Sequence, residues 1–171
     1  MISGMAGCSA EAKLARRLSK ANAFFDAGEF EKAEIEYKNA LQLVPMNPEA
    51  ISRLGLIFSA QGRSGVTAGF LIKAKELQPE NLDVRIKLGM LYASTGRLND
   101  AKEQAQFVLE RRPKDEDAPS LLAETVSQPK DIDEMRVRLK KLPDSGTVPI
   151  LLALGLLELR QPAVSEFVTS R

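Results

Sequence analysis

Side chains that often carry catalysis are scarce in this chain of 171 residues. It contains no histidine, and Cys8 is its only cysteine. Without histidine, the chain lacks imidazole acid–base catalysis, Ser-His and Cys-His nucleophile pairs, and His-ligated metals. A single cysteine allows neither an intramolecular disulfide nor a thiolate cluster. We therefore expect a protein that is not an enzyme and that uses no metal and no cofactor.

Two other segments contain residue types that occur in ligand-binding or catalytic sites: a glycine-rich run and an acidic run. The glycine-rich run GRSGVTAG at residues 62–69 lacks the Lys-Ser/Thr ending and the strand–loop–helix setting of a phosphate-binding loop. Asp115, Glu116 and Asp117 stand where a helix is expected to begin, and acidic residues there cap the helix and favour its dipole. We therefore expect both segments to have a structural role and not to form a functional site.

The charge balance bears on the kind of partner. The 24 lysines and arginines nearly cancel the 23 acidic residues, which leaves a net charge of +1. A near-neutral chain lacks the basic surface of a nucleic-acid-binding protein, and an aromatic content of 5% provides few rings for base stacking. We expect no nucleic-acid partner.

A step of 34 residues organises the sequence. The columns that repeat at this step are Gly28, Gly62 and Gly96; Pro45, Pro79 and Pro113; Phe24, Phe58 and Tyr92; and Asn47, Asn81 and Asp115. Apolar residues between them recur at helical spacing. Glycine can end a helix in the left-handed conformation, proline cannot continue one, and Asn or Asp caps the next. Each unit is thus predicted to be two helices joined by a glycine turn.

This unit resembles the tetratricopeptide repeat (TPR), a helix–turn–helix of 34 residues. The resemblance implies an all-α fold, a right-handed TPR superhelix (an α–α solenoid) of about four and a half repeats. The array is predicted over residues 12–171, with repeats at 14–47, 48–81, 82–115, 116–147 and an incomplete one at 148–171. Two glycines in the second helix of repeat two predict a softer helix, and repeat four, whose turn has no glycine, should be the least regular.

Small residues are expected where the two helices of a repeat touch, because a bulky side chain would overpack the contact. In the first helices these are Ala21, Gly55, Gly89, Ala123 and Gly155, and in the second helices they are Ala33 and Ala101. We interpret all of them as packing residues.

The N-terminal segment 1–11 is predicted to be a tail. Its residues Met5 to Ser9 resemble a bacterial lipobox, in which the cysteine, here Cys8, is the site of lipid attachment. Only seven residues precede Cys8, and none is basic, whereas a secretory signal needs a basic start and an apolar stretch. Either the signal begins upstream of Met1, or the match is accidental. A basic stripe follows, which either contacts anionic lipid or is a solvated helix face: Lys13, Arg16, Arg17 and Lys20.

The other end of the chain is unusually apolar. Residues 150–160, ILLALGLLELR, are apolar nearly all round but too short to span a membrane. A terminal repeat should instead present a polar outer face. We interpret the chain as the N-terminal part of a longer solenoid, with self-association through this exposed helix as the alternative.

The resemblance implies that a partner binds in a concave groove lined by the first helices. The inward positions of repeats one to three are Asn22, Phe25, Asp26, Arg53, Leu56, Ser59, Lys87, Met90 and Ser94. Their mixture of apolar and polar groups suits an extended peptide or an amphipathic helix. Chaperone-binding TPR domains hold a C-terminal carboxylate in a clamp of Lys, Asn and Arg. Only Asn22 matches that clamp, with Lys87 a substitute for its arginine.

We therefore expect a protein-interaction scaffold that binds a protein or peptide partner. The lipobox-like start resembles bacterial envelope TPR lipoproteins, which implies a periplasm-facing, membrane-anchored protein of an assembly, secretion or exopolysaccharide system. Two alternatives stay open: a cytoplasmic TPR adaptor without lipid, and the regulatory portion of a larger enzyme.

Overall fold

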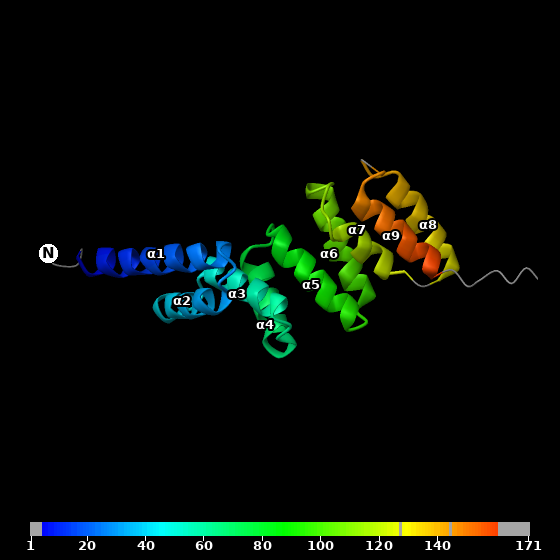
Figure 1. The fold of residues 1–171 in the computed structure, drawn as a ribbon. Coiled ribbons are helices and arrows are strands. Elements are labelled where there is room, and N and C mark those ends of the chain that lie inside the picture. Colours follow the sequence, from blue (N-terminus) through cyan, green and yellow to red (C-terminus); the bar gives the residue numbers. More distant parts are fainter. Residues whose placement is uncertain (1–4, 127, 144, 161–171) are drawn as a thin grey trace, which may run out of the picture. The chain divides into compact units, whose positions relative to one another are not determined.

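The computed structural model describes residues 5–126, 128–143 and 145–160, with only the backbone for residues 5–8 and 64. This part of the chain contains nine helices and no strand (Figure 1). The helices are α1 (Met5–Asp26), α2 (Phe30–Leu43), α3 (Pro48–Ala60), α4 (Ser64–Leu77), α5 (Leu82–Ser94), α6 (Leu98–Arg111), α7 (Ala118–Glu124), α8 (Pro129–Lys140) and α9 (Val148–Leu159). The predicted all-α helical repeat solenoid is confirmed.

The chain divides into two compact units, Met1–Lys87 and Leu88–Arg171. In the first unit, α1 packs on α2, α2 on α3, and α3 on α4. In the second unit, α7 packs on α6, α8 and α9, and α8 also packs on α9. Helix α5 contributes residues to both units. None of the described helices combines the length and the apolar character that a membrane span requires.

The glycine turns have the predicted backbone. Gly28, Gly62 and Gly96 have φ angles of 72°, 66° and 78°, in the left-handed region that other residues avoid. After each glycine, a backbone N–H donates to the carbonyl of the aromatic residue five positions earlier, at 2.8 to 2.9 Å: Glu29 to Phe24, Arg63 to Phe58, and Arg97 to Tyr92. This is the Schellman closure of a helix, which satisfies its last carbonyl groups.

The helix starts also follow the prediction, with one difference. Asn47 and Asn81 accept hydrogen bonds from the backbone N–H three residues later, at 2.9 and 3.1 Å. Asp115 does the same with Ala118 at 2.8 Å, and it also accepts from the N–H of Asp117. Helix α7 nevertheless begins only at Ala118, because Asp115 caps a bend that precedes the helix.

The helix ends agree with the proline column. Helices α2, α4 and α6 end at Leu43, Leu77 and Arg111, two residues before each repeating proline. Helix α4 has 14 residues, as α2 and α6 do, so its predicted softness does not shorten it and stays a prediction. Repeat four is irregular as predicted, since α7 has 7 residues where α3 and α5 have 13.

Small residues fill the predicted helix contacts in four of five first helices. Ala21 and Ala123 are completely buried. A Cβ added to Gly55 would lie 3.0 Å from a methyl group of Leu71, and one added to Gly89 would lie 2.7 Å from Leu121. At Gly155 an added Cβ would meet none of the described atoms within 4 Å, and its role as a contact residue stays a prediction. The helix predicted to cover Gly155 falls in residues 161–171, outside the described part of the chain.

The N-terminal region departs from the sequence interpretation in two ways. Helix α1 begins at Met5, so most of segment 1–11, predicted as a tail, is helical, while the side chain of Cys8 lies outside the described residues. The basic stripe is also partly used inside the chain. Arg17 and Lys20 form ion pairs of 2.7 and 2.6 Å with Glu36 on α2, whose side chain is 7% exposed. The stripe therefore holds α1 against α2, a role that neither predicted alternative included.

Candidate functional site

The predicted groove residues lie on the first helix of each repeat, and the described structure buries none of them. In the first unit, Asn22, Phe25 and Asp26 lie on α1; Arg53, Leu56 and Ser59 lie on α3; and Lys87 lies on α5. Met90 and Ser94 belong to the second unit, on the later part of α5. The site can therefore be built in detail on the first unit.

The structure brings Phe25 and Arg53 together across α1 and α3. The guanidinium carbon of Arg53 lies 4.4 Å from the centroid of the Phe25 ring, a cation–π contact. The Phe25 ring in turn lies 5.6 Å from the ring of Phe30. Stacking restricts the long Arg53 side chain while leaving its N–H groups free to point elsewhere, so less conformational entropy is lost when they bind an acceptor.

A polar relay joins three helices beside this contact. The buried hydroxyl of Tyr37 on α2 donates to Asn22 Oδ1 at 2.5 Å, and Asn22 Nδ2 donates to Glu49 Oε1 on α3 at 2.7 Å. Burial raises the pKa of Tyr37 to about 12, so its hydroxyl stays a donor at neutral pH. Both polar atoms of Asn22 therefore have partners within the chain.

Next to Arg53 lies a mainly polar pocket of about 180 Å³. Its lining residues come from α3, from the loop that follows α4 and from the start of α5: Glu49, Ser52, Arg53, Leu56, Gln78, Asn81 and Asp83. Inside it, Ser52 Oγ donates to Gln78 Oε1 at 2.5 Å, and Asn81 Nδ2 donates to the same oxygen at 3.2 Å. Hydroxyl, amide, carboxylate and guanidinium groups in one hollow suit a polar side chain or a peptide group of a ligand.

Of the residues that line this pocket, the sequence interpretation named Arg53 and Leu56, as groove residues, and it did not predict the pocket or the other five as ligand-binding residues. Glu49 precedes Arg53 by four positions and Leu56 by seven, so helical spacing alone places it on the same face of α3. Gln78 and Asn81 could not be found in this way, because a loop rather than a helix carries them into the pocket.

No group of three or more His, Cys, Asp or Glu side chains in the described part of the chain could hold a metal ion. The site is therefore described by its hydrogen-bonding groups, its charges and its apolar surfaces.

Comparison with known proteins adds the family. The model of the TPR repeat matches residues 21–62, which include the Tyr37–Asn22–Glu49 relay and Arg53. Solved TPR structures match most of the chain at low sequence identity. A tetratricopeptide repeat protein from Parabacteroides merdae covers 86% of this chain at 20% identity with a TM-score of 0.69, and this chain covers 59% of it. These findings support a TPR protein.

Two other solved structures come from proteins whose names state an activity or a bound peptide. The O-GlcNAc transferase of Thermobaculum terrenum is 24% identical with a TM-score of 0.61; the match covers 77% of this chain but only 26% of the transferase. The first TPR of Spaghetti (RPAP3), bound to an HSP90 peptide, is 20% identical with a TM-score of 0.57, over 67% of this chain and 90% of the other. Among curated proteins, the search finds no match.

Proposed function

We propose that this TPR protein is a non-catalytic scaffold that binds an extended peptide or a helix of a partner along the first helices of its repeats. One observation carries the proposal: Arg53, stacked 4.4 Å from Phe25, borders a polar pocket of about 180 Å³. The TPR fold supports a role in protein–protein interaction, and the Spaghetti structure, bound to an HSP90 peptide, is an example of such a complex.

The groups on α1 and α3 indicate what the ligand offers. Arg53 suits an acidic side chain or a backbone carbonyl, and Leu56 suits an apolar side chain one helical turn further along α3. Glu49 places a negative charge beside Asn22 and is bonded to it at 2.7 Å. A terminal carboxylate at Asn22 would meet that charge, so we propose an internal segment of the partner as the ligand, not a C-terminus.

On the first unit, the proposed binding surface uses seven of the nine predicted groove positions, while Met90 and Ser94, which belong to the second unit, stay predicted groove residues. On α1 and α3 these seven are Asn22, Phe25, Asp26, Arg53, Leu56 and Ser59, and on the first part of α5 the seventh is Lys87. We expect Phe25, Arg53 and Leu56 to contribute most of the binding free energy, because aromatic, arginine and apolar contacts dominate measured interfaces.

Site-specific photo-crosslinking in cells that express the full-length gene tests the groove. A photoreactive phenylalanine replaces Leu56 or Ser59 in the groove and, as the control, Ile35, which is 59% exposed on α2. The proposal expects the same protein to be crosslinked from both groove positions and not from position 35. Crosslinks from position 35 alone would contradict it.

We further propose that the protein acts at the bacterial cell envelope, in an assembly, secretion or exopolysaccharide system, anchored through lipid on Cys8. The lipobox-like residues Met5 to Ser9 support this location. Mass measurement of the mature N-terminus, with the full gene expressed, tests it. A lipid-modified Cys8 in the membrane fraction agrees with the proposal, and an unmodified Cys8 in the soluble fraction favours the cytoplasmic adaptor.

A second candidate function is the regulatory TPR portion of a larger enzyme. The specific observation in its favour is the likeness to the O-GlcNAc transferase, of which this chain matches about a quarter. The reading frame downstream of Arg171 separates the two: further repeats favour the scaffold, and a catalytic domain favours the enzyme.

Self-association through α9 is a further proposal. Four of its apolar side chains are more than half exposed: Val148, Leu151, Leu152 and Leu159. Contiguous apolar surface of this kind favours association. If α9 mediates it, Leu152→Glu will abolish concentration-dependent dimerisation in analytical ultracentrifugation; unchanged dimerisation, or a wild-type chain that is monomeric at all concentrations, would contradict the proposal.

A further inference from the structure

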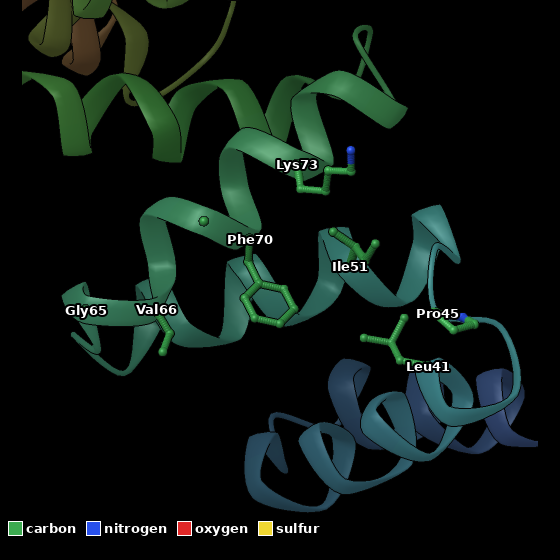
Figure 2. A pocket seen from close by; sticks show the side chains of 8 residues that line it. Leu41, Pro45, Ile51, Gly65, Val66, Phe70 and Lys73 are labelled. Carbon is green, nitrogen blue, oxygen red and sulfur yellow. The ribbon is translucent and has the colours of Figure 1, made fainter.

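A second pocket of the first unit lies between α2, α3 and α4, apart from the groove. It has a volume of about 410 Å³ and is lined by Leu41, Pro45, Ile51, Gly65, Val66, Gly69, Phe70 and Lys73 (Figure 2). Ile51 precedes Arg53 on α3 by two residues, which is about 200° around the helix. The pocket and the proposed groove therefore use different sides of α3.

The composition of α4 differs from its sister helices where the pocket forms. Val66 and Phe70 line the pocket, and Val66 is 41% exposed. One repeat away, the same positions carry polar residues: Lys32 and Glu36 in α2, and Asp100 and Gln104 in α6. Helix α4 has no charged residue from Ser64 to Ile72. Among repeats one to three, the apolar surface is therefore specific to repeat two.

The two glycines of α4 pack against none of the residues that the structure describes. A Cβ added to Gly65 or Gly69 would meet no atom within 4 Å, and neither residue has a positive φ. Glycine inside a helix lowers stability relative to alanine. Since neither a turn nor a close helix contact requires these glycines, their effect in the folded chain is to leave the pocket open.

One charge marks the rim. Lys73 is the only charged residue of the lining, and its Nζ lies 2.9 Å from Glu76, with both side chains substantially exposed. Such a surface pair contributes little free energy and is easily exchanged for another carboxylate. An apolar hollow with one cation at its edge complements an apolar group that carries a nearby anion.

We propose that this pocket is a second docking site, which receives a large apolar side chain of a partner protein whose neighbouring carboxylate binds Lys73. The apolar side chain lies against Ile51, Val66 and Phe70, in the space that Gly65 and Gly69 leave open. The Phe70 ring, held edge-on by Phe58 at a centroid distance of 5.0 Å, forms a rigid wall for it.

Two small probes test the site: 3-phenylpropionate, which carries an aromatic ring and a carboxylate, and 3-phenylpropionamide, its uncharged equivalent. Both are titrated into the full-length ¹⁵N-labelled chain while the amide signals of Gly65 and Gly69 are followed by NMR. We expect saturable shifts at both glycines, with the carboxylate binding at least threefold more tightly than the amide.

Two variants separate the parts of the proposal. Gly69→Leu fills the pocket and should abolish the shifts of Gly65, whereas Glu103→Leu, which places the same side chain at the equivalent position of α6, should leave them unchanged. Lys73→Met keeps the aliphatic stem and should remove the preference for the carboxylate probe. The absence of saturable shifts, binding that survives Gly69→Leu, or a carboxylate preference that survives Lys73→Met would each overturn the proposal.

Discussion

At the scale of single residues, glycine has two opposite effects in this chain. Gly62 is required by its backbone, with a φ of 66°, although an added Cβ would have open space around it. Gly69, seven residues later, has the same open space but lies inside α4 without a positive φ. The two positions therefore differ in backbone conformation and not in packing.

We predict that Gly62→Ala and Gly69→Ala change stability in opposite directions. Gly62→Ala should lower the free energy of unfolding by about 1–2 kcal/mol, since a Cβ resists the left-handed conformation. Gly69→Ala should raise it by about 0.5–1 kcal/mol through helix propensity and a less flexible unfolded chain. Urea unfolding of the two variants measures both values, and equal signs would contradict the turn assignment.

A second pair of glycines separates packing from propensity. A Cβ at Gly89 would lie 2.7 Å from Leu121 and 3.1 Å from Gln104, whereas one at Gly155 would meet no atom of the described residues within 4 Å. Gly89→Ala should therefore cost about 1–3 kcal/mol of stability through overpacking. Gly155→Ala should be neutral or stabilising by up to about 1 kcal/mol. Thermal unfolding measures the stability of both variants. A Gly89→Ala chain as stable as the wild type would contradict the close contact between Gly89 and Leu121.

At the scale of elements, the contact of α1 with α2 depends on Glu36, an acidic residue that the 34-residue repeat pattern does not single out. Glu36 is buried and accepts hydrogen bonds from Lys20 and Arg17 at 2.6 and 2.7 Å. The hydrogen bond from Lys20, with further help from Arg17, holds the pKa of Glu36 below its usual value of 4.5. The carboxylate therefore stabilises the folded chain only while it is ionised.

This gives a pH dependence with a defined sign. Because the pKa is lower in the folded chain, the stabilisation is complete above pH 4.5 and is lost as the pH falls through the folded-state pKa. Glu36→Gln should lower the free energy of unfolding by about 1–3 kcal/mol at pH 7. The difference from wild type should shrink toward pH 3. Urea unfolding at both pH values measures it, with exposed Glu31→Gln as the control; a difference independent of pH would contradict the ion-pair account.

The sequence could predict the elements because their signals are local. A glycine turn, a proline stop and an Asn cap each act within one helix end, so Gly28, Asn47 and Pro45 are sufficient to predict the boundaries around α2 and α3. Contacts between distant elements have no such signal. Arg160 donates to the carbonyls of Ala123, Glu124 and Val126 at 2.9 to 3.0 Å, which satisfies the end of α7 from more than 30 residues away.

At the scale of the whole molecule, the candidate site could be predicted only in outline. Helical spacing placed Arg53 and Leu56 on one face of α3, and the structure describes a pocket there. The side-chain amide of Asn22 is hydrogen-bonded to both Tyr37 and Glu49. Because these three side chains come from three helices, spacing along one helix cannot reveal their hydrogen bonds. Repeat proteins conserve the backbone path and vary the surface, so the pattern that identifies the fold carries little information about the ligand.

The central claim is that Arg53 and its neighbours bind a protein partner, and the affinity of the crosslinked partner segment tests it most directly. Fluorescence anisotropy compares the wild type with Arg53→Glu and with Lys38→Glu. The second variant reverses an exposed charge on α2 that pairs with Glu34 of the same helix at 2.6 Å. We predict that Arg53→Glu weakens binding at least tenfold, or about 1.4 kcal/mol, while Lys38→Glu stays within twofold. Binding unchanged by Arg53→Glu, in a chain whose thermal melt shows it folded, would contradict the account.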